Sequence, residues 1–259
     1  MRRYIVFMKQ VPRSMKVEMD SVTHTLKRSS ALVQTNPDDL YASQAALDLR
    51  RETGAEVVAV SMGPSSAEEV LREALQRGAD RAVLLSSPAF AGSDTWCTSL
   101  VLAAAVRKIG DYDLLFFGRM AIDGDTAQVG PEVAGQLDIP QVTNMVSLDG
   151  CSGNVVHVRR KSGNVVQYLD LEMPCAVMVG RENGILDYLT LSGWRHARKQ
   201  GIVRWNESDL QLDRTQVGLL ASPTRVVSVS VPQTSKTVQW LSDASSVTAI
   251  IDNCIHPLQ

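Results

Sequence analysis

The sequence predicts an α/β protein whose largely parallel sheet is flanked by helices. Two observations support this fold class. Up to about residue 145, short apolar segments alternate with amphipathic ones, and this alternation is typical of parallel strands joined by helices. After Pro140, two segments of alternating polarity surround a turn, which indicates an antiparallel extension of the sheet.

Four segments are expected to form the parallel strands. Each is short and apolar and contains β-branched or aromatic residues, as buried strands do. They are Tyr4–Met8, Glu56–Ser61, Arg81–Ser86 and Asp113–Phe117.

Three helices are expected between these strands. Asn36 is the expected cap of the first, because Pro37 suits the first helical position and acidic residues follow in the first turn. Ser66 is expected to open the second with a capping box that ends at Glu69. Glycine follows each helix, so the three are predicted from Pro37 to Gly54, from Ser66 to Gly78 and from Asp94 to Ile109.

The antiparallel extension is expected to be a meander. Asn154–Arg160 and Asn164–Leu171 alternate in polarity around a turn at residues 161–163, and Cys175–Val179 follows. After Gly180 the pattern is too irregular to predict a separate core. The basic run Arg195–Lys199 in this part is typical of a solvated face, or of a surface that attracts an acidic partner.

The glycine-rich segment from Gly118 to Pro131 indicates a binding site. It follows an apolar strand, and open α/β sheets bind ligands beyond the carboxyl ends of their strands. Asp123 and Asp125 would repel phosphate, so we assign them to ribose hydroxyls or to helix capping. Gly124 between them permits close approach to the backbone.

The same segment offers donors for phosphate. Thr126 and Gln128 are neutral donors, and the free N–H groups of a following helix favour anions. That helix is expected to begin either near Asp125 or at Pro131 with Gly130 as its cap. These features predict a nucleotide site, and a capped loop without a ligand is the alternative.

Composition excludes several classes of protein. The 259 residues are 44% hydrophobic and 21% charged with a net charge of −2, which is typical of a soluble globular protein without a bias towards nucleic acid. No apolar run reaches the ~18 residues of a membrane span. The first nine residues suit a buried strand better than a signal peptide.

Cysteine and histidine positions argue against a metal site. Neither residue type shows paired ligand spacing, and the cysteines are expected to be free thiols in a reducing cytoplasm. They are Cys97, Cys151, Cys175 and Cys254. The sequence also lacks the Gly-x-Gly-x-x-Gly and Gly-x-x-x-x-Gly-Lys-Ser/Thr motifs.

Many short motifs, in order, carry a family resemblance. They include Met8-Lys9-Gln10-Val11, Asn36-Pro37-Asp38-Asp39, Ser61-Met62-Gly63-Pro64, Ala121–Pro131, Pro140-Gln141-Val142-Thr143, Met173-Pro174 and Ser222-Pro223-Thr224. With these motifs the chain resembles the β subunit of electron transfer flavoproteins over nearly its whole length. The resemblance implies an adenine nucleotide α-hydrolase-like fold and a heterodimer with an α subunit that carries a flavin.

The resemblance further implies an adenine-containing cofactor in this chain. In one branch of the family it is AMP with a structural role, and in the electron-bifurcating branch it is FAD reduced by NADH. The wording of Phe90–Thr95 and of Asp123–Pro131 resembles the bifurcating branch. Residues 1–185 are expected to form the nucleotide-binding domain, and residues 186–259 a recognition loop and an arm that packs on the α subunit.

Site residues are also implied by the resemblance. Cofactor-binding positions on the nucleotide side are Phe7 and Lys9 at the end of the first strand, Asn36, Asp38 and Asp39 near the adenine and ribose, and Ser61, Met62 and Gly63 beside the nucleotide. Those near a flavin ring or nicotinamide are Phe90, Ser93 and Thr95. Those in the phosphate loop are Asp123, Gly124, Asp125, Thr126, Ala127, Gln128 and Val129. Leu191 and Arg160 match partner-recognition positions. Met62 and Phe90 also fit ordinary core packing.

Three positions depart from the family pattern. Met120 stands where glutamine is common, Ser192-Gly193 replaces a proline after Leu191, and Lys161 occupies a position that is often acidic. These departures put in doubt one amide hydrogen bond and the identity of the partner that docks beside Leu191.

The expected function is that of an electron-carrier subunit with no catalytic side chain of its own. NADH would reduce the flavin, and one electron would pass through the α subunit to an acyl-CoA or other flavin-linked dehydrogenase. The other electron would pass to ferredoxin or flavodoxin. A subunit with structural AMP is the alternative, and an adenylating enzyme is disfavoured because residues 9–14 lack the required Ser-Gly-Gly loop.

Overall fold

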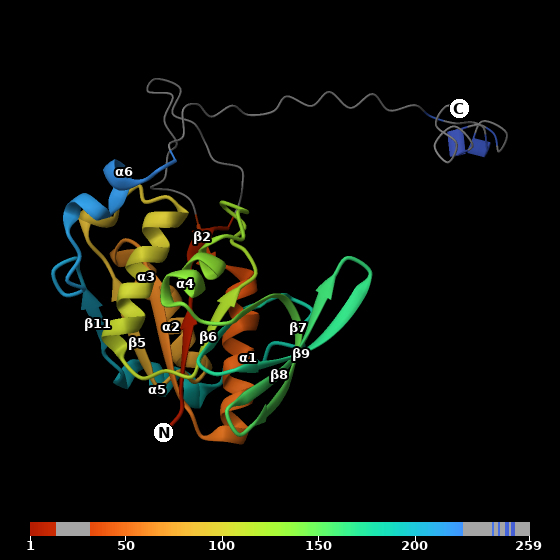
Figure 1. The fold of residues 1–259 in the computed structure, drawn as a ribbon, viewed down its shortest axis with the longest axis horizontal. Coiled ribbons are helices and arrows are strands. Elements are labelled where there is room, and N and C mark those ends of the chain that lie inside the picture. Colours follow the sequence, from red (N-terminus) through yellow and green to blue (C-terminus); the bar gives the residue numbers. More distant parts are fainter. Residues whose placement is uncertain (14–31, 225–239, 241–242, 244–246, 249, 252–259) are drawn as a thin grey trace. The chain divides into compact units, whose positions relative to one another are not determined.

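The computed structural model describes residues 1–13, 32–224, 240, 243, 247–248 and 250–251 (Figure 1). Residues 1–225 form one compact unit, and residues 226–259 form another. Most of the expected partner-wrapping arm lies outside the described residues. The division of the chain at residue 185 stays a prediction.

One nine-stranded sheet runs through the described part of the first unit. Neighbours are parallel from β11 to β7, and β8 and β9 are then added antiparallel. In spatial order the strands are β11 (Ile202–Trp205), β5 (Arg81–Leu85), β4 (Glu56–Met62), β1 (Arg3–Phe7), β6 (Leu114–Gly118), β10 (Cys175–Val179), β7 (Gln141–Ser152), β8 (Val155–Ser162) and β9 (Val165–Glu172). The predicted α/β class with a largely parallel sheet is confirmed.

Helices cover both faces of the parallel part (Figure 1). Side chains alternate along each strand, so Tyr4 and Val6 of β1 enter one core while Ile5 and Phe7 enter the other. The first core is closed by α1 (Pro37–Thr53) and α2 (Glu68–Arg77), and the second by α3 (Thr95–Ile109) and α4 (Val129–Leu137). Burial of each large aliphatic side chain stabilises the fold by roughly 1.5–3 kcal/mol, so the two cores hold the helices against the sheet.

The two capping predictions have different outcomes. Asn36 is the N-cap residue of α1, as predicted, although its side chain makes no cap hydrogen bond. Ser66 lies in a short 3-10 turn (Ser65–Ala67) before α2, and its hydroxyl donates to Gln10 Oε1 instead of capping. Both side chains therefore bind other segments, which local sequence could not indicate.

The helix after the glycine-rich segment begins between the two predicted points. Its first residue is Val129 and its cap is Gln128, so neither Asp125 nor Gly130 caps it. Pro131 lies within the first turn. The N–H groups of a first turn have no intrahelical partner, and proline therefore costs the helix no hydrogen bond there.

The strands β10 and β7 differ from the predicted meander. β10 does not join the antiparallel part but pairs in parallel with β6 and β7. All five of its residues, Cys175–Val179, are buried, as in parallel strands covered on both faces. β7 was not predicted, because its polar residues and register shifts hide the strand pattern.

The described chain after β10 contains regular elements that the sequence did not predict. They are α5 (Leu191–Lys199), β11, a 3-10 turn (Arg214–Gln216) and α6 (Gly218–Ala221). α5 packs on α2, where Arg72 donates to the carbonyl oxygens of Ala197 and Gln200 at 2.8 and 2.9 Å. Gly193 permits this contact, because a Cβ there would lie 2.0 Å from Gln76 O.

A 3-10 turn (Pro88–Phe90) also follows β5, and a separate two-stranded sheet pairs β2 (Gln10–Pro12) with β3 (Val33–Thr35). The pair lies between the end of β1 and the start of α1. It therefore sits beside the carboxyl ends of the parallel strands.

Candidate functional site

A cavity of about 790 Å³ lies at the carboxyl ends of the central strands. β1 lies between β4 and β6, so the chain moves outward from β1 in one direction and then returns to its other side. Such a reversal of strand order leaves a crevice, which is the usual ligand site of open α/β sheets. The cavity volume falls within the range of small-molecule and cofactor sites.

The floor of the cavity is apolar. Phe7 of β1 stacks on Phe117 of β6, with ring centroids 4.2 Å apart and an interplanar angle of 5°. Val60, Met62 and Leu102 extend this floor. An apolar floor of this kind suits a flat ring system more than a hydrated ion.

The loop after β6 forms one wall. Asp125 and Ala127 have positive φ angles of 51° and 52°, and Gln128 follows in the right-handed helical region. A left-handed residue followed by a right-handed one turns successive backbone N–H groups towards one point, where they form an anion-binding nest. The amino end of α4 adds the positive end of its dipole to the same wall.

Close packing brings that wall onto the floor. A Cβ on Gly130 would lie 2.9 Å from Met178 Cε and 3.2 Å from Phe117 Cγ. Because glycine lacks a side chain, the first turn of α4 can lie against the aromatic pair.

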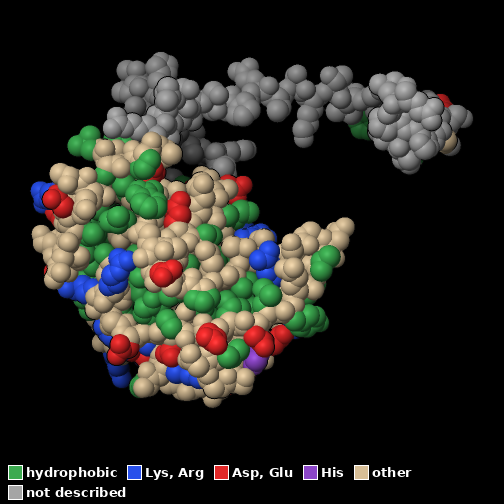
Figure 2. Space-filling view, in the orientation of Figure 1, with side chains coloured by type: hydrophobic (Ala, Val, Ile, Leu, Met, Phe, Trp, Pro, Cys, Tyr) green, Lys and Arg blue, Asp and Glu red, His purple; other side chains and the backbone are tan. Residues whose placement is uncertain are grey.

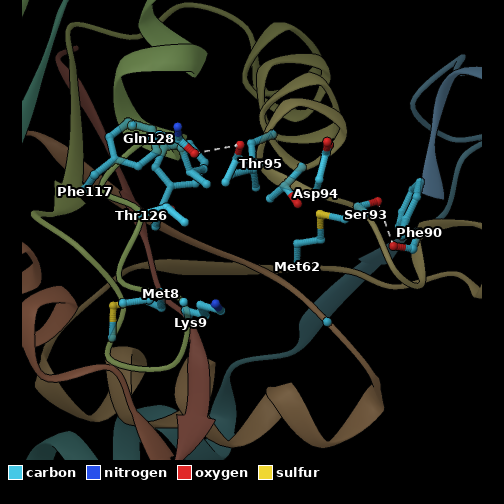
Figure 3. Close-up of a pocket in the computed structure, with 18 of the residues that line it drawn as sticks. Met8, Lys9, Met62, Phe90, Ser93, Asp94, Thr95, Phe117, Thr126 and Gln128 are labelled. Atoms are coloured by element: carbon cyan, nitrogen blue, oxygen red, sulfur yellow. Dashed lines mark hydrogen bonds between the residues drawn. The ribbon is translucent and has the colours of Figure 1, made fainter. Parts of the chain in front are cut away.

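The segment before α3 and the first residue of that helix form a second wall, which adjoins the first (Figure 3). The hydroxyl of Thr95 lies 3.2 Å from both Gln128 Oε1 and Glu132 Oε1, so it can donate to one of them at a time. Ser93 Oγ donates to Phe90 O, and Phe90 is buried in the core with 5% of its surface exposed. Figure 3 shows Thr95 and Gln128 side by side, joined by a hydrogen bond.

Asp94 fixes the position of this second wall. Its carboxylate accepts from Cys97 N and caps α3, and it also accepts from the backbone and hydroxyl of Thr224. Burial favours the neutral form, but these hydrogen bonds outweigh it and lower the pKa of Asp94. The carboxylate therefore ties the described end of the chain to the cavity rim.

The predicted residues at the start of α1 divide into two groups. Asp39 lines the cavity, whereas Asp38 turns away and pairs with Arg181 at 2.5 Å, with Arg119 3.7 Å from its other oxygen. Asn36 does not line the cavity either and is 1% exposed. Consecutive helical residues point in different directions, so Asp39 lines the cavity while Asp38 pairs with arginine side chains.

Asp39 is a buried carboxyl group at the cavity edge. Its oxygens accept from Lys9 N at 2.7 Å and from Asn36 Nδ2 at 2.9 Å. Burial raises the pKa of Asp39 to about 7, although both hydrogen bonds favour the carboxylate. The group thus changes charge near neutral pH.

Asp123 makes an ion pair at the rim. Its carboxylate lies 2.7 Å from Lys9 Nζ, and it does not line the cavity. The pair joins the end of β1 to the loop after β6. A predicted ribose contact from Asp123 would therefore have to compete with Lys9.

The cavity brings together most of the predicted cofactor positions. Those that line it are Phe7, Lys9, Asp39, Met62, Gly63, Phe90, Ser93, Thr95, Gly124, Asp125, Thr126, Ala127, Gln128 and Val129. Asn36, Asp38, Ser61 and Asp123 lie outside its lining. Ser61 follows Val60 in β4, so strand alternation directs it to the other face of the sheet.

Further lining residues were not named singly as cofactor positions, although several lie in the predicted segments Phe90–Thr95 and Gly118–Pro131. They are Met8, Val60, Pro64, Ser86, Ser87, Pro88, Ala91, Gly92, Asp94, Thr98, Leu102, Phe117, Gly118, Arg119, Met120, Ala121 and Gly130. Many directly follow β5 or β6. A rule that collects every residue after a parallel strand would have found those.

A second candidate surface surrounds Leu191, the first residue of α5. Leu191 is 64% exposed, and neighbouring apolar side chains are exposed with it: Ile185, Tyr188, Leu189 and Trp194. We call these five residues the α5 patch. Basic Arg195, Arg198 and Lys199 follow on the same helix.

The α5 patch lies at the opposite edge of the sheet from the cavity. His196 Nε2 lies 3.0 Å from Ala79 O, and residue 79 precedes the start of β5. Figure 1 shows α5 beside the amino terminus, where β1 begins.

The other predicted recognition residue, Arg160, lies in β8. It pairs with Met145 of β7 and Gln167 of β9, away from both the cavity lining and α5. The β8–β9 hairpin also exposes three apolar side chains, Val165, Val166 and Tyr168. Figure 2 shows the hairpin projecting from the rest of the surface.

Within the described parts of the chain, no group of three His, Cys, Asp or Glu side chains could hold a metal ion. Across the same residues, every helix is too short or too polar to cross a membrane.

Comparisons with known proteins agree with this geometry. Residues 23–210 match the family model of the electron transfer flavoprotein domain. The chain is 41% identical over 233 residues to the electron transfer flavoprotein subunit beta of Thermoanaerobacterium thermosaccharolyticum, which covers 90% of this chain and 89% of that one. It is 40% identical over 225 residues to the caffeyl-CoA reductase-Etf complex subunit CarD of Acetobacterium woodii, with 86% of each covered. It is 42% identical over 236 residues to protein FixA of Azorhizobium caulinodans, with 88% of this chain and 84% of FixA covered.

Proposed function

Because the chain belongs to the electron transfer flavoprotein family as a β-type subunit, we propose that it holds FAD in the cavity and takes part in electron bifurcation. In this function NADH would reduce the flavin that the cavity residues hold. One of the two electrons would then pass through an α subunit to a flavin-linked dehydrogenase such as an acyl-CoA dehydrogenase, and the other to ferredoxin or flavodoxin.

One observation carries the proposal: the cavity joins an anion-binding wall to an apolar floor. The nest at Ala127–Gln128 and the amino end of α4 suit the phosphates of the cofactor. The stacked pair Phe7–Phe117 suits a flat ring. The residues present therefore fit an adenine dinucleotide.

The size of the cavity favours FAD over AMP. AMP contains fewer than half of the heavy atoms of FAD, and it would leave much of the 790 Å³ to water. The space continues from the loop at Gly124–Gly130 to Ser93, where a flavin ring is expected by family resemblance. A subunit with structural AMP is the second candidate.

The protein's own residues bind and orient the cofactor. FAD supplies the redox chemistry when it is bound, and no side chain of the chain has to act as a nucleophile or a general base. Thr95 and Gln128 lie side by side in the cavity wall and can hold polar groups of the cofactor. The apolar floor excludes water from its ring.

Partner binding is proposed for the α5 patch. Exposed apolar side chains with a polar or basic rim are typical of docking sites, and Tyr and Trp often carry the binding energy there. Since the cavity and the α5 patch lie at opposite edges of the sheet, an electron held in the cavity needs a second carrier to reach a partner at the patch. The α-subunit flavin fits that role.

The proposed compartment is the cytoplasm. Cys97, Cys151 and Cys175 are unpaired, which fits a reducing environment.

The decisive experiment counts cofactors. The purified heterodimer is denatured, and the released flavin and nucleotide are separated and quantified per complex. Two FAD molecules support the proposal, whereas one flavin with one AMP supports the second candidate. A heterodimer that releases no adenine-containing molecule from this subunit would contradict both.

A further inference from the structure

Asn36 connects two segments beneath the cavity. Its Nδ2 donates to Asp39 Oδ1 and to Met120 O, both at 2.9 Å, and its Oδ1 accepts from Ile122 N at 3.2 Å. Asn36 and Asp39 belong to the start of α1, whereas Met120 and Ile122 belong to the loop after β6. One buried side chain thus holds the loop against the helix.

The same connection continues to the end of β1. Asp39 Oδ2 accepts from Lys9 N at 2.7 Å, and Asn36 N donates to Lys9 O at 2.8 Å. Gly118 lies so close that a Cβ there would be 2.2 Å from Asp39 Oδ1. Three segments that border the cavity therefore meet around Asn36.

The hydrogen-bond pattern requires an amide. Asn36 gives two donors and one acceptor, and each has a backbone or carboxyl partner. An alanine would leave the carbonyl of Met120 and the N–H of Ile122 without these partners. An aspartate would lose both donors and bring a second carboxylate beside buried Asp39.

We propose that Asn36 is a positioning residue, which fixes the loop at 118–122 and through it the cofactor-binding segment at 123–130. The effect on cofactor binding rests on the proposed function. The effect on the loop does not, because it follows from contacts within the chain.

The test compares Asn36→Ala with Asn154→Ala in the full-length chain. Asn154 is a matched control, because its Nδ2 also donates to a backbone carbonyl, that of Met173, at 2.7 Å. Amide hydrogen exchange of residues 118–128 is measured without cofactor, and the dissociation constants for FAD and AMP are measured separately. Asn36→Ser, which keeps one hydroxyl, serves if the alanine variant does not fold.

We expect Asn36→Ala to speed exchange at residues 118–122 at least tenfold and to weaken nucleotide binding at least tenfold, with Asn154→Ala changing neither. Asn36→Ser should lie between wild type and alanine. Unchanged exchange in the Asn36 variants overturns the positioning role. Faster exchange with undiminished affinity overturns its link to the cofactor.

The proposed function fails separately. If wild-type protein binds neither FAD nor AMP while exchange still depends on Asn36, the cavity has another ligand and the positioning role stands.

Discussion

Asp39 lines the cavity, and its raised pKa of about 7 makes its charge depend on pH near neutrality. Its carboxyl is buried between Lys9 N and the Asn36 amide, and no cation contacts its oxygens among the described residues. Its neighbour Asp38 is buried as well but has an arginine partner. The difference between two adjacent acids comes from the direction of each side chain on α1.

The first prediction concerns stability against pH. The folded pKa of Asp39 is raised from 3.8 to about 7, so the folded state binds its proton more tightly than the unfolded state. The free energy of unfolding should therefore fall as pH rises from about 4 to about 7 and then level off. Asn in place of Asp39 should remove this slope. Urea unfolding at pH 5, 6, 7 and 8 measures it, and a slope unchanged in Asp39→Asn contradicts the assignment.

Between pH 5 and pH 8, the titration of Asp39 is separated from that of most other carboxyl groups. Glu56, Asp94, Asp149, Asp187, Glu207 and Asp213 have lowered pKa values, so their contributions are lost only below the range tested. Burial also raises the pKa of Glu132, so the comparison is made between wild type and Asp39→Asn.

The second prediction concerns Gly118. Alanine there would place Cβ 2.8 Å from Asp39 N as well as against its carboxylate, and this backbone cannot move without shifting α1. We expect Gly118→Ala to destabilise the fold by about 1–3 kcal/mol, as overpacking does. The affinity for the cofactor should fall with it.

Gly135 supplies the control for this substitution. It lies inside α4, and a Cβ would meet nothing within 4 Å. Gly135→Ala should therefore be neutral or stabilise the fold by up to about 1 kcal/mol. A loss of stability equal to that of Gly118→Ala would show that crowding is not the cause.

At the scale of elements, all three helix ends were predicted, and so were the beginnings of α1 and α3. Gly54 ends α1 with a positive φ of 67°, and α2 and α3 end before Gly78 and Gly110, as predicted. A helix end needs a local backbone shape that glycine supplies. The beginning of α1 at Asn36 was predicted correctly, whereas that of α2 was not, because Ser66 bonds to a distant segment instead of capping the helix.

The third prediction follows from this contrast. Thr190 caps α5, since its hydroxyl accepts from Gly193 N at 3.0 Å. Thr190→Ala should destabilise the helix start by about 1 kcal/mol. Hydrogen exchange at residues 193–195 should speed up accordingly.

Ser66→Ala is the matched test of an absent cap. The Ser66 hydroxyl makes no cap hydrogen bond, so its removal should change stability by less than about 0.5 kcal/mol. If Ser66→Ala instead frays α2, the capping box forms after all.

At the scale of the whole molecule, the cavity and the α5 patch occupy opposite edges of one sheet. The two sites share no residue, and α5 contacts the sheet through α2 rather than through the loop after β6. The free-energy effects of substitutions at two sites that share no contacts are usually additive.

The fourth prediction is independence of the two sites. Leu191→Ala should weaken capture of the dehydrogenase partner at least tenfold, because it removes an exposed apolar anchor. The dissociation constant for FAD should stay within twofold of the wild-type value. Loss of FAD in this variant would mean that the patch and the cavity are coupled.

The sequence by itself determined the parallel strands and the glycine-rich loop after β6, because each depends on short-range patterns. Thr126 and Gln128 were found in this way, whereas Phe7 and most other cavity positions came from the family resemblance. The tertiary structure alone decided that β10 lies inside the parallel sheet, that α5 is a helix and that Asp38 turns away from the cavity while Asp39 lines it. These features depend on which distant segments pack together, since burial and hydrogen bonding across the fold outweigh local preference.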